Sequence, residues 1–149
     1  MVPIMIETLE TMRRVALSCL SIPYIWGGNS PITGFDCSGF LQHILLSAGL
    51  DPPGDQTAQS LYDHFDNRSM TNHGVRKLGA LAFYGRSVTK ISHCAFILNG
   101  FQIIHASGGD RTTVSIKSPY GFVKVTHMDY RKDLVDTLMP DYGSIGVAR

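Results

Sequence analysis

Residues 34–40 read Gly34-Phe35-Asp36-Cys37-Ser38-Gly39-Phe40 and follow a segment dense in proline and glycine. Asp36 is a residue type that caps helices, and the apolar residues after it recur at helical spacing. This predicts a helix over residues 37–48 that Gly49 closes. The thiol of Cys37 then lies in the first turn of a helix. The dipole there favours an anion, so we expect the pKa of Cys37 to fall toward that of a reactive thiolate.

The same local pattern also fits a buried cysteine that only packs, and the segment alone leaves both interpretations open. The chain has three cysteines, Cys19, Cys37 and Cys94, and no CxxC pair. This odd, unpaired set disfavours a zinc knuckle, a thioredoxin-like motif and a disulfide framework. At least one thiol therefore stays free, which permits a catalytic role.

Helical spacing of apolar residues also predicts helices over residues 4–20 and 55–67. From Val75 onward the chain consists of short runs rich in β-branched and aromatic residues, and Asn99-Gly100 between two of them predicts a hairpin. Helices followed by an antiparallel sheet indicate one α+β domain over residues 1–149, with N-terminal helices packed on a central sheet of about five strands. The expected strands are residues 78–84, 92–98, 102–106, 112–117 and 122–128, and residues 140–149 form a tail or a terminal strand.

Two histidines lie on the two expected strands that this hairpin joins, His93 in SHCAFIL and His105 in IIHAS. A thiolate, a base and a group that orients the base make up a catalytic triad, and Cys37, His93 and His105 supply these residue types. A lone histidine on a strand is more often structural, but two on neighbouring strands after a capped cysteine favour catalysis. The three side chains could instead bind zinc, which explains the helix cap and the glycines less well. We therefore expect no metal and no cofactor.

Three segments together resemble a known family: PYIWGGNSPITGFDCSGF, SHCAFIL and IIHAS. They are similar to the NlpC-type cell-wall cysteine peptidases, a papain-like group, in the order and separation of the motifs. The resemblance covers residues 16–107. It implies a papain-like fold in which Cys37 is the nucleophile, His93 the base and His105 the residue that orients the base. It also implies that Tyr24 lies over the site, where its hydroxyl could help to stabilise the oxyanion.

Members of that family usually cleave the bond between D-isoglutamate and the diamino acid in peptidoglycan stem peptides, so the resemblance implies a peptidoglycan endopeptidase that acts through a thioester. Four further residues are candidates for oxyanion or substrate binding. Trp26 could form a pocket wall or pack within its loop, and Asp36 is expected to cap the helix and not to act as an acid or base. Ser38 belongs to the segment whose backbone amides could hold an oxyanion. Ser92 could bind a substrate amine or only partner its neighbours.

The chain also departs from the family pattern. Residues 77–81 read Lys-Leu-Gly-Ala-Leu where the family carries a proline–glycine–aspartate turn, and Gly54-Asp55 replaces an arginine near the substrate site, although Gln59 fits. Position 94 is a cysteine where a small aliphatic residue is common. Because side chains alternate along a strand, Cys94 is expected to face opposite to His93 and to belong to the core.

Composition excludes some other functions. The formal net charge is +1, so no nucleic acid is expected as a partner, and no apolar run is long enough to insert into a membrane. Charged residues interrupt the apolar N-terminus, so we expect an amphipathic helix and no signal peptide. The resulting expectation is synthesis in the cytoplasm and action on peptidoglycan at the cell wall, after delivery by a phage tail or a secretion machine as partner.

Two rival functions remain open. The same triad would serve an amidase or acyltransferase that acts on another amide. A non-catalytic assembly module could also retain the fold, although the intact Cys37, His93 and His105 argue against it.

Overall fold

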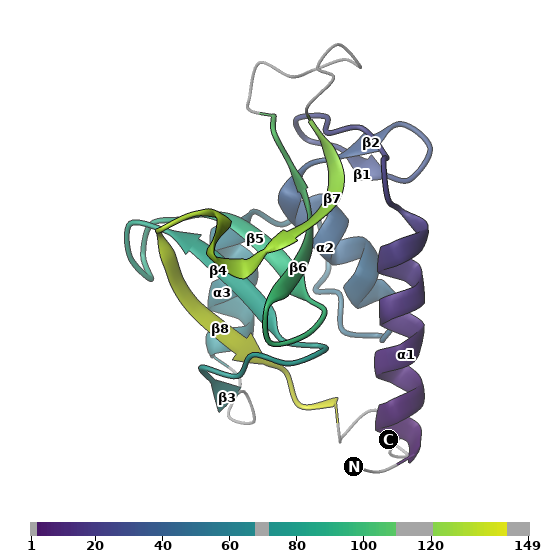
Figure 1. Ribbon diagram of the computed structural model, residues 1–149, viewed down its shortest axis with the longest axis vertical. Helices are drawn as coiled ribbons and strands as arrows, with labels where there is room; N and C mark the ends of the chain where they lie inside the picture. Colours follow the sequence, from purple (N-terminus) through teal and green to yellow (C-terminus); the bar gives the residue numbers. More distant parts are fainter. Residues whose placement is uncertain (1–2, 68–71, 110–120, 143–149) are drawn as a thin grey trace.

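The computed structural model describes residues 3–67, 72–109 and 121–142 of the 149-residue chain. Its helices precede its main sheet in the sequence and flank it in space (Figure 1). None of the helices in these residues combines the length and the apolar character that a membrane span needs. The helices are α1 (Pro3–Ser18), α2 (Cys37–Leu46) and α3 (Ala58–Asp66), with a 3-10 turn at Met128–Tyr130.

The main sheet has six described strands in the order β3-β8-β4-β5-β6-β7, and each neighbouring pair is antiparallel. A separate two-stranded ribbon, β1 with β2, lies in the loop before α2. The expected α+β architecture is therefore confirmed. The strands are β1 (Asn29–Ser30), β2 (Gly34–Phe35), β3 (Asn72–His73), β4 (Leu81–Gly85), β5 (Ile91–Ile97), β6 (Gln102–Ser107), β7 (Phe122–His127) and β8 (Leu134–Met139).

Strand β8 was not expected, and its sequence shows why. Asp133 and Asp136 flank or interrupt its apolar residues, which hides the strand pattern. Inside the fold, the Asp136 carboxylate accepts a hydrogen bond from the Tyr62 hydroxyl at 2.9 Å and pairs with Nδ1 of His73 at 2.6 Å. The expected strand over residues 112–117 lies outside the described residues, as does most of the expected tail over 140–149.

The core lies between the sheet and the helices. Helix α2 packs against β5 and β6, and α3 packs against β5. The register pairs Phe83 with Cys94, which places both on the face of the sheet that α3 covers, where Phe83 meets the ring of Tyr62 edge-on. Tyr84 pairs with His93 on the opposite face. The expectation that Cys94 faces opposite to His93 and is buried is thus confirmed.

The first turn of α2 approaches the preceding loop so closely that only glycine fits at position 39. The Gly28 carbonyl accepts the Asp36 amide at 3.0 Å, which brings the loop backbone onto the helix start. A Cβ on Gly39 would collide with that carbonyl oxygen and approach a carboxylate oxygen of Asp36. The colliding group is backbone, so it cannot move aside as a flexible side chain could.

We therefore expect Gly39→Ala to lower the free energy of unfolding by about 1–3 kcal/mol, as overpacking of a tight site does. Urea unfolding followed by circular dichroism measures the change. Gly100→Ala is the matched control, because the nearest atom to its new Cβ is 3.7 Å away, and its unfolding midpoint should stay close to that of the wild type. Equal midpoints for Gly39→Ala and the wild type would contradict this account.

Candidate active site

The helix start that carries Cys37 is held by the side chain of Asp36. One carboxylate oxygen of Asp36 accepts hydrogen bonds from the Gly39 amide at 2.7 Å and from the Ser38 hydroxyl at 3.2 Å, and the other accepts from the Gly27 amide at 3.1 Å. The expected N-cap is therefore confirmed. Burial raises the pKa of Asp36, and the bonds from Gly39, Ser38 and Gly27 oppose the rise. All these bonds fix the backbone on both sides of Cys37.

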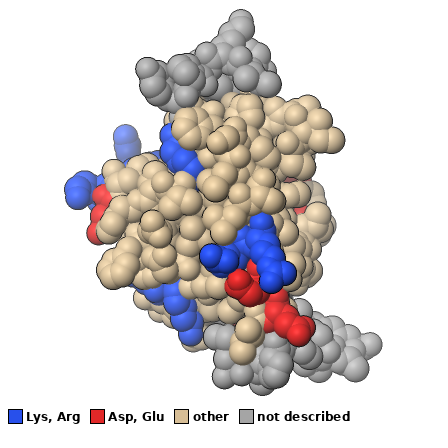
Figure 2. All heavy atoms as spheres, turned by 45° about the vertical axis from the view of Figure 1, so that its right-hand side comes forward, with Lys and Arg blue, Asp and Glu red and all other residues tan. Residues whose placement is uncertain are grey.

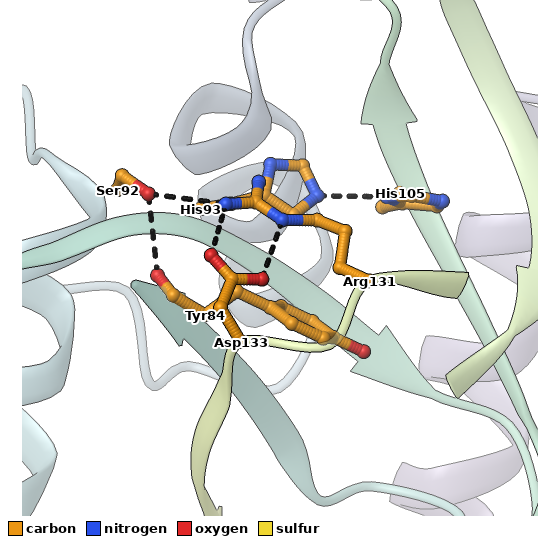
Figure 3. A network of polar contacts seen from close by, with 6 residues as sticks. All are labelled: Tyr84, Ser92, His93, His105, Arg131 and Asp133. Carbon is orange, nitrogen blue, oxygen red and sulfur yellow. Dashed lines mark hydrogen bonds and ion pairs between the residues drawn. The ribbon is translucent and has the colours of Figure 1, made fainter. Parts of the chain in front are cut away.

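His93 and His105 meet side by side on one face of the sheet. Their rings are joined by a contact of 2.8 Å between Nε2 of His93 and Nδ1 of His105 (Figure 3). His93 is 6% exposed and His105 is fully buried. The β5–β6 register pairs Phe96 with Ile104 and Ile97 with Ile103. It puts the two histidines in diagonal positions on the same face, which explains their contact.

Cys37 reaches these histidines because the edge of β5 is open at this point. The Ile97 amide bonds to Ala80, just before β4, whereas the Leu98 amide bonds to Gln102 on the β6 side. Amides alternate along a strand, so the Cys94 amide also points to the β6 side. There the Cys94 amide helps to lower the pKa of Cys37, beyond the last β5–β6 pair at Phe96.

The Cys37 sulfur is surrounded by hydrogen-bond donors. The pKa of Cys37 lies well below its ordinary value, because hydrogen bonds from the Cys94 thiol and then from the His93 side chain outweigh the effect of burial. Nε2 of His93 faces His105, which leaves Nδ1 as the nitrogen that meets Cys37. The three residues expected to form a triad thus lie in one hydrogen-bonded series.

Thr126 on β7 extends this series. Its hydroxyl lies 2.9 Å from Nε2 of His105. Burial, and after it the nearby His93 and Lys124, lowers the pKa of His105 to about 2, so the ring is neutral at neutral pH. A neutral imidazole carries one N–H. If Nδ1 of His105 accepts from His93, its Nε2 must donate to Thr126, so Thr126 selects the tautomer in which His105 orients His93.

A second network surrounds His93 on the side away from the helices (Figure 3). The Arg131 guanidinium forms two bonds with the Asp133 carboxylate, at 2.8 and 2.5 Å, and a longer one of 3.4 Å with the Ser92 hydroxyl. Ser92 also donates to the carbonyl of Tyr84 at 3.5 Å. Ser92 is therefore held by its neighbours, although it is exposed and borders His93.

The aromatic candidates lie on the loop before α2. Tyr24 is buried and its backbone bridges Phe35, two residues before Cys37. Its ring is packed so closely by Gly109 that a Cβ there would collide with it. Trp26, in contrast, is 52% exposed, which places it at the surface and not in the core.

Gln59 of α3 holds the N-terminal end of β5, the strand that carries His93. Its side-chain amide donates to the Val88 carbonyl at 2.8 Å, and its oxygen accepts the Ile91 amide at 2.7 Å. Both bonds anchor the turn that leads into β5. Gln59 thereby sets the position of His93, two residues after Ile91, without touching it.

A polar hollow of about 180 Å³ lies along α2. Gly54 and Asp55 line it, so the departure from the family pattern noted above places a carboxylate where an arginine is usual. Asp51 adds a second carboxylate. The other lining residues are Asn29, Gly39, Gln42, His43 and Leu46. Elsewhere, the face shown in Figure 2 is largely uncharged, and its Lys and Arg residues fall into separate groups, some of them next to Asp or Glu.

Sequence reasoning missed Thr126 and the contact between Cys94 and Cys37. Thr126 lies two residues after Lys124, on the same face of a half-exposed strand, and no motif marks it. Cys94 was assigned to the core alone. The sequence did hold a signal for the Cys94 contact. Cys94 follows His93 on the strand and therefore lies on the opposite face of the sheet, toward the helices, and one of these helices begins at Cys37.

The lowered pKa of Cys37 predicts an unusual pH profile for its alkylation. An ordinary thiol gains thiolate about tenfold per pH unit up to its pKa of about 8.5. Because the pKa of Cys37 is lowered, its rate with iodoacetamide should level off at a lower pH than that of an ordinary thiol. Mass spectrometry of the labelled peptide measures the rate, and His93→Asn should move the inflection upward. A tenfold rise per unit between about pH 6 and 8 in the wild type would contradict the assignment.

The role of Thr126 predicts that Thr126→Val strands a buried N–H of His105. Such a loss costs about 1–3 kcal/mol of unfolding free energy, whereas Thr126→Ser keeps the acceptor and should cost much less. Urea unfolding measures the cost. Long-range nitrogen–proton NMR spectra of the histidine rings report the tautomer, which should become mixed only in the valine variant. An unchanged single tautomer in Thr126→Val would show that Thr126 does not select it.

Comparison with known proteins places this geometry in a family. A model of the NlpC/P60 family matches residues 21–131. The bifunctional muramidase/DL-endopeptidase CwlT of Bacillus subtilis is 30% identical over 113 residues, which cover 74% of this chain and 33% of CwlT. A gamma-D-glutamyl-L-lysine dipeptidyl-peptidase of Bacillus cereus is 33% identical over 95 residues, which cover 62% of this chain and 27% of the relative.

Among solved structures, the NlpC/p60 domain of the peptidoglycan hydrolase SagA superposes with a TM-score of 0.64 at 27% identity, over 87% of this chain and 97% of that domain. The chain spans about a third or less of the length of the two curated relatives above, but nearly all of this isolated domain. The family model covers well over half of the 149 residues, and the chain therefore belongs to the NlpC/P60 family.

Proposed function

We propose that this domain is a cysteine peptidase that hydrolyses peptidoglycan stem peptides. One observation supports the proposal most. A continuous series of side chains begins at Cys37, at the start of α2, and runs through His93 and His105 to Thr126 on β7. A thiol with a lowered pKa next to an imidazole, which a neutral buried residue holds in place, has the parts of a nucleophile, a base and an orienting group.

The chemistry follows from these positions. The Cys37 thiolate attacks the amide carbonyl, and the carbonyl oxygen becomes an oxyanion. The amides of Gly39 and Phe40 are already bonded to Asp36, so those of Cys37 and Ser38 are the ones at the helix start that can meet the oxyanion. His93, protonated by the thiol, gives its proton to the leaving amine as the C–N bond breaks. A thioester on Cys37 remains.

Hydrolysis of the thioester uses the same groups in reverse. His93 removes a proton from water, the hydroxide attacks the thioester carbonyl, and the C–S bond breaks. The product is a carboxylic acid, and the thiolate is restored beside the protonated His93. Neutral His105 holds the ring of His93 through both steps and adds no charge to it.

The relatives support a peptide bond of the cell wall as the target. CwlT is named a DL-endopeptidase, and the Bacillus cereus relative is named for a gamma-D-glutamyl-L-lysine bond. We therefore propose the bond between D-isoglutamate and the diamino acid, which the sequence resemblance also implies. The alternatives, an acyltransferase or an amidase on another amide and a non-catalytic module, retain the same fold and are separated by the experiment below.

Replacement of the nucleophile tests the proposal. Cys37→Ala should reduce the release of stem-peptide fragments from purified peptidoglycan roughly 10³-fold or more, because loss of a nucleophile removes the covalent route. Liquid chromatography with mass spectrometry measures the fragments. Cys19→Ala, which removes a buried thiol at the end of α1, is the matched control and should retain the activity.

The products decide between the rivals. Fragments with a new free amine on the diamino acid support the proposed bond, whereas fragments joined to an added amine indicate acyl transfer. Undiminished hydrolysis by Cys37→Ala would overturn the nucleophile assignment. Binding of the wild type to peptidoglycan without any hydrolysis would favour the non-catalytic module.

A further inference from the structure

Cys37 does not stand alone at the site, because a second thiol lies against it. Cys94 is on β5, is 0% exposed and points from the sheet toward the helices, where the first turn of α2 presents Cys37. The two thiols lie near enough that each shifts the pKa of the other, downward for Cys37 and upward for Cys94. The mechanism proposed above needs the amide of residue 94, which any residue except proline supplies, but it does not need a thiol there.

We propose that Cys37 and Cys94 form a reversible disulfide when hydrogen peroxide reaches the site. The two thiols face each other where the first turn of α2 packs on β5, so a small shift of the side chains would bring the sulfurs to the bond length of about 2.05 Å. They come from different elements, a helix start and the middle of a strand, and the packing of α2 on β5 holds both in place.

The two thiols differ in exposure and in pKa, and both differences determine which of them peroxide oxidises first. Cys37 is half-buried and has a lowered pKa, so it is both the accessible thiol and the one present as a thiolate. Burial raises the pKa of Cys94, which keeps it protonated and shielded. Peroxide therefore attacks Cys37 first.

The reaction balances in two steps. The Cys37 thiolate attacks one oxygen of hydrogen peroxide, the O–O bond breaks, and the released hydroxide takes a proton to leave as water, which gives a sulfenic acid on Cys37. The sulfur of Cys94 then attacks the sulfur of the sulfenic acid. The S–O bond breaks, the hydroxide leaves with the Cys94 proton as water, and the S–S bond forms. Two thiols are oxidised by two electrons, and one peroxide is reduced to two waters.

The disulfide would change the fate of an oxidised enzyme. A sulfenic acid without a partner proceeds to sulfinic and sulfonic acids, which thiol reductants do not reverse. A disulfide with Cys94 stops at the first stage and returns to two thiols on reduction. Cys94 would thus turn irreversible damage at Cys37 into a reversible block.

Peptide mapping tests this in the intact protein. The wild type, Cys94→Ala and the control Cys19→Ala are treated with a small excess of hydrogen peroxide, blocked with iodoacetamide and digested without reduction. In the wild type and in Cys19→Ala we expect the peptides of Cys37 and Cys94 to be linked with the loss of two hydrogen atoms. Dithiothreitol should then restore the reaction of Cys37 with iodoacetamide almost completely.

In Cys94→Ala we expect no link, accumulation of sulfinic and sulfonic acid on Cys37, and recovery by dithiothreitol lower by about tenfold or more. Absence of the link in the wild type, a link from Cys37 to Cys19, or equal recovery with and without Cys94 would each overturn the proposal. The map of the wild type decides even if Cys94→Ala fails to fold. Since no readout uses peptidoglycan, the result is independent of whether the domain cleaves it.

Discussion

The site depends on one exchange of hydrogen bonds at the edge of β5. Near the turn of the hairpin β5 pairs with β6, but at Cys94 the amide on that side bonds to the Cys37 sulfur that begins α2. The sheet and the helix thereby meet at a sulfur atom and not at a backbone carbonyl. Cys37 and His93 come together beyond the point where the β5–β6 pairing ends.

The surrounding packing serves to keep that meeting point fixed. Asp36 holds the helix start through bonds to three residues, and the absence of a side chain on Gly39 lets the loop backbone close over it. On the other side, His105 and Thr126 fix the ring of His93 from β6 and β7. Each of these residues restrains a different part of the site, so the position of Cys37 relative to His93 results from many modest constraints and not from one strong interaction.

Much of this could be predicted from the sequence where the signal is local. The cap at Asp36, the helix after it and the Asn99-Gly100 hairpin follow from a few adjacent residues, and the hairpin brings His93 to His105. Strand β8 could not be predicted, because Asp136 within it is satisfied by Tyr62 and His73, which are far away in the chain. Thr126 and the contact of Cys94 with Cys37 escaped prediction for the same reason, since each depends on the register between elements.

The hydrogen bonds of Gln59 affect the order in which the elements of the protein unfold. It joins α3, a helix of nine residues, to the strand of His93 by two hydrogen bonds. Short helices at the surface open at a lower free energy than the central strands of a sheet. Partial melting of α3 would release the start of β5 while the sheet persists, so heat inactivation would set in below the temperature of global unfolding.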